Sequence, residues 1–412
     1  MAETVEIAIV GAGVVGLAIA HRLASAGREV VVIDPAPPGS GASYGNAGTV
    51  ADYAVQPVGT PEVLKNLPAL LFDRNSPLAI RKAALPTLAP WLLRFAWQSL
   101  PAAARRNALA LAGILHDAAP RWRDLASEIG GEGILQARGC LYWYRTDRAL
   151  AAAEADFRFR RACGVAMERL TATELAALEP GLPVTGGGAA FFPGALFMTD
   201  PGAMVSRLAQ AAWTRGARHL AARVTGLCRT SGGVHLSGPD LAINARHAVI
   251  AAGAHSRNLA LQAGDRIPLD TERGYHLEWD MTQAPLTRPV CPTDRGFYLC
   301  PMEGRLRAAG TVELGGLTAP PSAHRLARLA DGARSVLPDL PEPSRDWMGF
   351  RPSIPDSLPV VGPSRGGKDV LFAFGHGHIG LTLAPITAAM IAAEILGSAP
   401  LGGSEALRAT RF

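Results

Sequence analysis

The stretch Thr4-Val-Glu-Ile-Ala-Ile-Val10 and the turn that follows it, Gly11-Ala-Gly13-Val-Val-Gly16, decide the fold of this chain. They predict a buried β-strand that ends in a glycine-rich turn and leads into a helix over residues 17–26. Gly11 permits the tight turn, Gly13 lets the backbone approach a pyrophosphate, and Gly16 lets the helix lie close to the sheet. The arrangement predicts a dinucleotide-binding unit.

The residues after the turn complete this unit. Val14 and Val15 open the helix, whose free N–H groups and positive dipole end attract phosphates. The second strand, 30–33, ends at Asp34, where a carboxylate accepts hydrogen bonds from both ribose hydroxyls and repels a 2′-phosphate. The sequence therefore predicts a dinucleotide other than NADP. A glycine turn in an ordinary α/β protein is the alternative.

Composition limits the other classes of function. The chain has 412 residues, of which 48% are hydrophobic and 18% charged, so we expect large cores and two domains. The net charge of +5 comes from scattered arginines rather than from a dense basic block, which gives little support to nucleic-acid binding. Five cysteines without a C-x-x-C pair favour a reducing, cytoplasmic compartment. The sequence predicts neither a signal peptide nor a membrane-spanning helix.

The rest of the chain alternates between helical and strand-like patterns. A stretch at about 57–130 predicts an insertion of helices at 61–71, 78–100 and 102–115. An apolar strand at 247–251 ends in Ala252 and Gly253, small residues that allow the close approach of a cofactor. Other strands are predicted at 140–144, 188–192, 219–227, 275–279, 296–301, 306–311 and 370–373, and other helices at 149–163, 173–178, 201–216, 322–337 and 382–396.

Four segments carry a resemblance to a known family. They are the N-terminal unit, Ser43-Tyr-Gly-Asn-Ala-Gly48, Gly349-Phe-Arg-Pro352 with Pro359-Val-Val-Gly362, and Gly375-His-Gly-His-Ile-Gly-Leu-Thr382. On these motifs the chain resembles the FAD-dependent amine and amino-acid oxidoreductases of the D-amino-acid oxidase superfamily, and most of all the bacterial D-amino-acid dehydrogenases and their cyclic-imino-acid relatives. Two details depart from the pattern: Asp34 stands where glutamate is commoner, and no cysteine lies beside the C-terminal motif, so we expect non-covalent FAD.

The resemblance implies an α/β fold with two domains. A Rossmann-like FAD-binding domain is expected from residues 1–52, 199–260 and 346–412. An α+β substrate domain with a mixed or antiparallel sheet, carrying the helical insertion, is expected from 53–198 and 261–345.

The resemblance also assigns the cofactor-binding residues. The loop 375–380 is expected to pass along the flavin ring, and the helix from Thr382 to direct its positive end at the edge of the flavin that becomes negative on reduction. The full set that we expect to bind FAD is Gly11, Gly13, Val14, Val15, Gly16, Asp34, Ser43, Asn46, Ala47, Gly48, Val224, Ala252, Gly253, Gly375, Gly377, His378, Ile379, Gly380, Leu381 and Thr382.

Four residues are the candidates for handling the substrate. Arg351 is expected to hold the substrate carboxylate, because a planar guanidinium binds it through two hydrogen bonds. Tyr298 matches a carboxylate-binding tyrosine of related oxidases, with a core aromatic as the alternative. Tyr275 and its neighbour His276 point to opposite faces of one strand, and we expect Tyr275 to face the pocket. His378 is expected to border the substrate amine or the flavin.

The implied reaction is the oxidation of a D-amino acid or cyclic D-imino acid by hydride transfer from Cα to flavin N5, with the electrons passed to a quinone or another acceptor. The alternatives are an oxygen-using oxidase of the glycine or sarcosine oxidase type, a non-catalytic flavin-binding protein and a nicotinamide-linked dehydrogenase. His376 and His378 have a His-x-His spacing, but no carboxylate or cysteine accompanies them in the segment, so no metal site is predicted.

The helical insertion suggests a partner. Trp91, Trp97 and the arginines near them are consistent with peripheral contact with the inner face of the cytoplasmic membrane, near the quinone. Such amphipathic helices more often cover a core or a subunit interface, which is the alternative. The sequence leaves the oligomeric state open.

Overall fold

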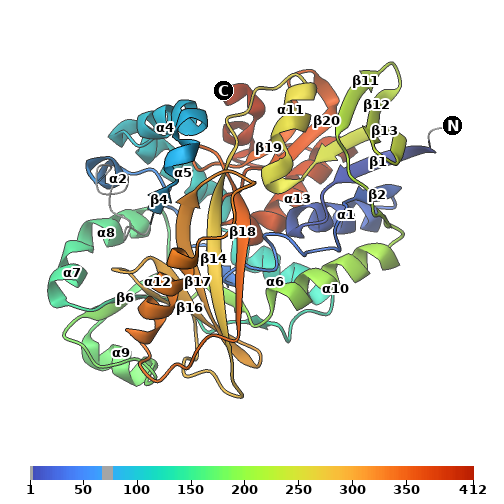
Figure 1. The fold of residues 1–412 in the computed structure, drawn as a ribbon. Helices are drawn as coiled ribbons and strands as arrows, with labels where there is room; N and C mark the ends of the chain where they lie inside the picture. The colour runs from blue at the N-terminus through green and yellow to red at the C-terminus, as the bar shows by residue number, and fades with distance from the viewer. Residues whose placement is uncertain (1–2, 67–77) are drawn as a thin grey trace.

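The computed structural model describes residues 3–66 and 78–412, and its framework is a parallel sheet (Figure 1). Strand β1 (Glu3–Val10) pairs in parallel with β2 (Val30–Ile33) on one side and with β13 (Leu241–Ile250) on the other. The parallel set is extended by β10 (Arg218–Leu220) beside β2 and by β20 (Gly367–Phe374) beside β13. Because β2 and residues 7–10 of β1 are buried, they are short continuous apolar runs rather than alternating ones.

Antiparallel strands complete this sheet. Their bounds are β11 (Gly226–Thr230), β12 (Gly233–Gly238) and β19 (Val360–Ser364). The prediction of one strand at 219–227 is wrong, because the chain leaves the sheet at 221–225. Strand β10 lies at one edge of the sheet and β11 at the other, so a single strand cannot join them.

Helices pack against the parallel sheet and share its core. α1 (Val14–Ser25), α10 (Pro201–Thr214) and α13 (Gly380–Leu396) lie there together with two helices of the insertion, α5 (Pro101–Leu115) and α6 (Ala118–Glu128). The indole of Trp122 on α6 donates to the carbonyl of Leu381 at a distance of 2.9 Å. The insertion therefore supports the start of α13.

A second, largely antiparallel sheet stands beside the first, and its long strands β14 and β18 run down the middle of the molecule (Figure 1). Its strands in spatial order are β18 (Arg345–Ser353), β14 (Asp270–Asp280), β17 (Arg305–Leu314), β16 (Phe297–Met302), β15 (Val290–Pro292), β6 (Cys140–Tyr144), β8 (Gly188–Phe192) and β7 (Glu168–Leu170). Helix α12 (Ala323–Arg334) covers one face and shares a core with it.

The insertion is more varied than expected. Residues 78–100 do not form one helix: β4 (Leu78–Ile80) pairs in parallel with β17, and α4 (Leu85–Gln98) follows after the 3-10 turn η1 (Lys82–Ala84). Residues 312–314 of β17 extend past the end of β16, and the hydrogen bonds that they offer override the helical pattern there. The predicted helix 61–71 appears as α2 (Pro61–Lys65), and its residues 67–71 lie outside the described part of the chain.

The remaining elements are short. A three-stranded sheet consists of β3 (Thr49–Val50), β9 (Leu196–Met198) and β5 (Leu135–Gln136). The other helices are α7 (Asp147–Ala152), α8 (Glu154–Ala162), α9 (Ala172–Leu178) and α11 (Arg257–Gln262), with 3-10 turns η2 (Gly253–His255), η3 (Ser404–Leu407) and η4 (Ala409–Arg411). The predicted helix 149–163 is thus split in two.

These observations confirm the predicted α/β fold class with a second, mixed sheet. The division of the chain into domains by residue range stays a prediction. Strand β18 belongs to the second sheet, although its residues lie almost wholly in the segment 346–412 that was expected with the first.

Candidate active site

A cavity of about 830 Å³ runs between the two sheets. One end lies at the carboxyl ends of the parallel strands and is lined by residues 10–15, 33–37 and 251–255. The other end lies on the second sheet and is lined by residues 309–312 and 347–352. Ligand pockets have volumes of about 300–1,000 Å³, so this cavity is large enough for an extended cofactor with a substrate.

The glycine turn forms the first end of the cavity. Gly11 has φ +115°, and a Cβ atom there would stand 2.4 Å from the carbonyl oxygen of Ala251. A Cβ atom on Gly16 would stand 2.0 Å from the carbonyl oxygen of Gly11. Gly13 caps α1 without a side chain, so the N-terminus of that helix faces the cavity. Gly16 itself does not line the cavity and serves the packing of helix on strand.

Asp34 and Ser43 shape the same end. The Asp34 carboxylate accepts the N–H groups of Ala12 (2.8 Å) and Ala36 (2.9 Å) and lines the cavity. The hydroxyl of Ser43 accepts the N–H of Val14 at 3.0 Å. The two side chains thereby fix the turn around the opening of α1.

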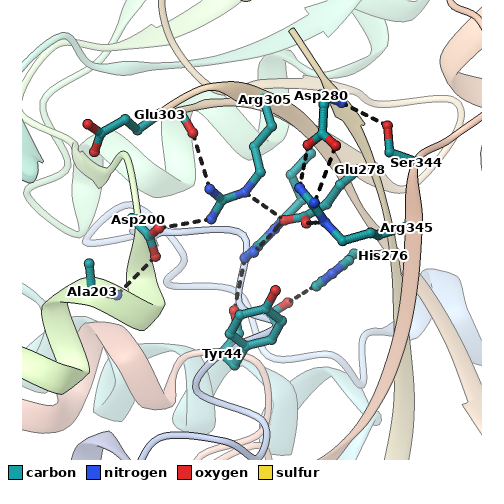
Figure 2. Close-up of polar contacts among 12 residues, drawn as sticks. Tyr44, Asp200, Ala203, His276, Glu278, Asp280, Glu303, Arg305, Ser344 and Arg345 are labelled. Carbon is teal, nitrogen blue, oxygen red and sulfur yellow. Dashed lines mark hydrogen bonds and ion pairs between the residues drawn. The ribbon is translucent and has the colours of Figure 1, made fainter.

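An ion cluster anchors the loop that carries Ser43 and Asn46 to the second sheet. Glu278 on β14 is 1% exposed, and Arg305 and Arg345 approach it from the neighbouring strands β17 and β18 (2.9 and 3.0 Å), as Figure 2 shows. Arg305 also binds Asp200, the residue that caps α10. The cluster therefore joins the second sheet to a helix of the first.

Arg307 connects this cluster to the loop itself. Its guanidinium is fully buried, binds Glu278 through Nε (2.8 Å) and donates through Nη1 to the carbonyls of Tyr44 (3.0 Å) and Asn46 (2.5 Å). Burial by itself raises the pKa of Glu278, but the charge and hydrogen bonds of the arginines outweigh it and lower the pKa to about 2. We call Glu278 and Arg307 the loop clasp.

The C-terminal loop and α13 border the second end of the cavity. Ile379, Gly380, Leu381 and Thr382 line it, and the Thr382 hydroxyl accepts the N–H of Ala51 at 3.0 Å. Helix α13 begins at Gly380 without a side-chain cap, and its first residues line the cavity, so its positive end borders the cavity. That this end points at the edge of the flavin stays a prediction.

Two histidines of this loop have lowered pKa values, although His376 is buried in the protein and His378 is exposed. His376 donates or accepts a hydrogen bond with Thr387 (3.0 Å), and burial lowers its pKa to about 3. His378 faces the cavity, and desolvation there together with the charge of Arg351 lowers its pKa to about 4. His378 thus lies beside the arginine that was expected to hold the substrate.

Arg351 projects into the cavity from β18. Its Nη1 donates to the carbonyl of Thr311 at 3.3 Å, and in the described residues it forms no ion pair within 4.0 Å. Burial lowers its pKa, against the opposing effect of Glu272. A half-buried guanidinium with no directly paired carboxylate is suited to an incoming anion.

Tyr298 reaches the cavity from β16. Its hydroxyl donates to the hydroxyl of Tyr142 (3.1 Å) and lies 3.4 Å from that of Tyr53. Tyr142 also lines the cavity, whereas Tyr53 is fully buried against Phe192. The three phenols form one wall of the substrate end.

Tyr275 does not have the expected role. It touches the cavity, but its hydroxyl donates to Glu313 at 2.6 Å and accepts the N–H of Ser322 at 3.2 Å, on the side of α12. The opposite face of the strand carries His276, whose ring stacks on Trp347 at 5.1 Å. Tyr275 and His276 do point to opposite faces of the strand, as alternation predicts. The phenol of Tyr275, however, donates its hydrogen bond to the buried carboxylate of Glu313.

Sequence reasoning missed several lining residues, among them Glu272, Trp347 and Tyr142. Glu272 is 4% exposed and stands opposite Arg351 in the register of β14 and β18. The alternation of β14 would have suggested Glu272, because it shares a face with His276 and Gly274.

Most of the expected cofactor residues gather around the cavity. Those that line it are Gly11, Gly13, Val14, Val15, Asp34, Ser43, Asn46, Ala47, Val224, Ala252, Gly253, Gly377, His378, Ile379, Gly380, Leu381 and Thr382. Gly48 and Gly375 do not line it. Gly48 has φ +80° and faces the carbonyl of Met198, and Gly375 has φ +83° and packs on Ile354, so both serve the backbone.

The comparisons with known proteins agree with this geometry. The family model for FAD dependent oxidoreductases matches residues 6–394. The chain belongs to this family. Its cofactor is therefore FAD.

Relatives and solved structures cover the whole length. A protein of Bradyrhizobium diazoefficiens named D-amino-acid oxidase is 37% identical over 97% of both chains. A D-amino acid dehydrogenase of Dechloromonas aromatica is 29% identical over 96% of this chain and 98% of its own. The crystal structure of glycine oxidase from Geobacillus kaustophilus superposes with a TM-score of 0.79 at 24% identity, covering 100% of this chain and 99% of that one, which shows the same fold.

The lining residues fit FAD. The bare backbone at Gly11 and Gly13, the N-terminus of α1 and the carboxylate of Asp34 suit the pyrophosphate and the adenosine ribose. The loop 375–380 and the start of α13 suit the flavin ring at the other end. Non-covalent binding stays a prediction. Cys291 lines the substrate end, and burial raises the pKa of its thiol, which keeps it a poor nucleophile.

Within residues 3–66 and 78–412, no cluster of three or more histidine, cysteine or acidic side chains is arranged to hold a metal ion. Over the same residues, no helix has the length and apolar character needed to cross a membrane.

Proposed function

We propose that this FAD-dependent oxidoreductase oxidises a D-amino acid or a cyclic D-imino acid at Cα and passes the electrons to a quinone or another non-oxygen acceptor. The observation that carries the proposal is the half-buried guanidinium of Arg351, which lines the cavity without an ion pair among the described residues. The names of the relatives support amino acids as the substrate class, with the D-configuration preferred.

FAD supplies the two-electron acceptor, which takes up a hydride from the substrate Cα. Arg351 binds the substrate carboxylate and so fixes the orientation of Cα. The phenols of Tyr298 and Tyr142 border the substrate end and exclude bulk water from it. Uncharged His378 borders the same space without repelling a substrate ammonium group.

The test is anaerobic bleaching of the yellow holoenzyme. D-alanine, D-proline, hydroxy-D-proline, glycine and sarcosine are each mixed with the protein, and the loss of flavin absorbance is followed. We expect rapid bleaching by at least one D-amino or D-imino acid and slower bleaching by its L-enantiomer. A holoenzyme that no amino acid bleaches would exclude an amino-acid oxidoreductase and revive the non-catalytic flavin protein.

An oxygen-using oxidase is the second candidate. The relative that is 37% identical carries the name of an oxidase, which favours oxygen as the acceptor. The two candidates are separated by mixing the reduced protein with air-saturated buffer in a stopped-flow instrument. Slow reoxidation that a quinone accelerates supports the dehydrogenase, and fast reoxidation with release of peroxide supports the oxidase.

A contact with the membrane would bring the site near a quinone. Leu93 and Trp97 on α4 are 74% and 68% exposed, and exposed arginines of α4 and α5 lie near them in the sequence. Trp91, the other tryptophan of the prediction, is 6% exposed and stacks on Phe95, so it belongs to the core. We propose that Leu93 and Trp97 insert into an anionic membrane surface.

Cosedimentation with phosphatidylglycerol vesicles tests this contact. The double substitution Leu93→Ser and Trp97→Ser should abolish cosedimentation, whereas Val184→Ser, at an apolar residue that is 80% exposed outside these helices, should not. If wild-type protein does not cosediment with the vesicles at low salt, the proposed membrane contact is wrong.

A further inference from the structure

We propose that Glu272 binds the ammonium group of the substrate and accepts its proton before the Cα–H bond breaks. The proposal rests on the proposed function, because it assigns a second recognition group to the same amino-acid site. It concerns a buried acid that neither the sequence motifs nor the family assignment uses.

The strand register places Glu272 and Arg351 side by side. They face each other on β14 and β18, and paired residues of an antiparallel ladder project to the same face. The guanidinium of Arg351 does not turn toward Glu272 but lies over Gly274, two residues further along β14. Both side chains line the cavity.

The charges of Glu272 and Arg351 act on each other at a distance, but the two side chains form no direct ion pair. Among the described residues, no ion pair within 4.0 Å involves Glu272 or Arg351. Buried charges are normally paired, since removing them from water is costly. An amino acid is a zwitterion, so its carboxylate would pair with Arg351 while its ammonium group pairs with Glu272.

The groups around Glu272 favour its action as a proton acceptor. Among the described residues, Arg351 on β18 acts on the charge of Glu272, and His376 and His378 of the C-terminal loop line the same small pocket as Glu272. Leu314 is the register partner of Glu272 on β17. Burial raises the pKa of Glu272, while Arg351 and a hydrogen bond from Ser353 oppose the rise. A carboxylate bound to Arg351 cancels the positive charge, so the pKa of Glu272 rises further when the substrate binds.

The proton and the electrons balance as follows. The substrate ammonium gives a proton to the Glu272 carboxylate and becomes a neutral amine. The Cα–H bond then breaks with its electron pair, which the bound FAD would accept as a hydride, and the nitrogen lone pair forms the C=N bond of a protonated imine (iminium). Glu272 releases the proton to solvent as the product leaves.

A purely structural role is the alternative, in which Glu272 only moderates the charge of Arg351. The two roles differ in which ligands sense the substitution Glu272→Gln. The probes are 2-aminoisobutyrate, which has an ammonium group but no Cα–H bond to break, and isobutyrate, which lacks the amine. Their dissociation constants are measured on the oxidised holoenzyme from changes in the flavin absorption spectrum.

We expect wild-type protein to bind 2-aminoisobutyrate more tightly than isobutyrate. In Glu272→Gln the ratio of the two dissociation constants should change by about 10- to 100-fold against 2-aminoisobutyrate, which corresponds to the loss of one charge-assisted hydrogen bond. Isobutyrate should bind Glu272→Gln as well as or better than wild type. The matched control is Asp270→Asn on the same strand, outside the cavity lining, which should keep the preference. An unchanged preference in Glu272→Gln, or equal changes for both ligands, would overturn the proposal.

The pH profile supplies a second measurement. With a substrate that bleaches the wild type, the bleaching rate of Glu272→Gln should be strongly reduced at pH 7 and rise about tenfold per pH unit, because only free amine then reacts. A parallel profile in both proteins would contradict proton transfer to Glu272.

If Glu272→Gln does not retain FAD, the variants Glu272→Asp and His378→Asn test the proposal in its place. Both keep a carboxylate at position 272, so both should still prefer 2-aminoisobutyrate, and the preference should fall as acid protonates that carboxylate. A preference independent of pH in both variants would overturn the proposal. Failure of every amino acid to bleach the wild type would instead reject the proposed function, and the binding preference would still test Glu272.

Discussion

The guanidinium of Arg351 lies over Gly274, where a Cβ atom would stand 2.6 Å from Arg351 Cζ. Gly274 is paired across the strands with Gly349, and the ring of Trp347 occupies the space where a Cβ of Gly349 would be. The two glycines thus form a bare floor on which a cation and an indole lie. This floor fixes the position of the guanidinium that we propose as the binding group for the substrate carboxylate.

We expect Gly274→Ala to displace the guanidinium without unfolding the protein. The colliding atoms are the end of a flexible side chain rather than backbone, so Arg351 can move. Binding of isobutyrate should weaken by about tenfold or more, since aligned charge-assisted hydrogen bonds are lost. The measurement is spectral titration of the holoenzyme.

The matched control is Gly113→Ala on α5, where a new Cβ would meet no atom within 4 Å. This substitution should leave isobutyrate binding unchanged and slightly favour the helix. Unaltered ligand binding in Gly274→Ala would mean that Arg351 does not act from its position over the glycine.

Arg351→Lys should separate carboxylate binding from cofactor binding. A lysine keeps the charge but cannot donate two parallel hydrogen bonds to one carboxylate. We expect isobutyrate affinity to fall about 10- to 100-fold, with the FAD content of the purified protein unchanged. Loss of FAD together with ligand affinity would indicate a structural arginine instead.

Local sequence patterns predicted an element correctly where the residues that determine its structure are close together in the sequence. The strand, glycine turn and helix around Gly11 were predicted because the turn needs a positive φ and the helix needs a bare Gly16. The sequence pattern predicted a helix at the residues of β4. They form a strand because they pair with β17, which lies more than two hundred residues away in the sequence. No pattern in the local sequence predicts the pairing of β4 with β17.

The candidate site follows the same logic. Arg351 lies in a motif that local sequence reveals. Tyr275 was preferred over His276, its neighbour on the opposite face of the strand, and the acid that accepts the hydrogen bond of Tyr275 is Glu313, from another strand. The choice between faces depended on a partner distant in sequence, so the sequence alone did not contain it.

Two glycines of the N-terminal turn should respond differently to alanine. Gly11→Ala meets the backbone of Ala251 at 2.4 Å and requires φ +115°, so we expect little folded protein. Gly13→Ala meets only the Ser43 hydroxyl at 3.4 Å, so it should fold but bind FAD more weakly, because its Cβ enters the path of the pyrophosphate. Thermal unfolding and flavin content are the measurements. Equal flavin content in Gly13→Ala and wild type would contradict the assigned role.

The loop clasp should control FAD retention. Arg307→Lys cannot bind Glu278 and the carbonyls of Tyr44 and Asn46 at once, so the loop that lines the cavity loses its anchor. We expect a dissociation constant for FAD that is raised by about tenfold or more. Arg345→Lys, at a side chain that is 49% exposed, removes a more solvated contact with Glu278 and should have a smaller effect. Equal effects of the two substitutions would argue against the contact with the loop.

Glu278 makes the stability of the clasp depend on pH in a defined direction. Its folded pKa, about 2, lies below its ordinary value of 4.5, so its charged form stabilises the fold above the ordinary value, and this contribution is lost as the pH falls toward 2. At pH 7, Glu278→Gln should cost about 3–5 kcal/mol in the free energy of unfolding, because Arg307 is left buried with its charge unpaired. The difference between wild type and Glu278→Gln, measured by denaturant unfolding of the holoenzymes, should be constant above pH 5 and narrow steadily below it. A difference that widens on acidification would mean that Glu278 is protonated in the folded protein, and the clasp would then be a hydrogen bond rather than an ion pair.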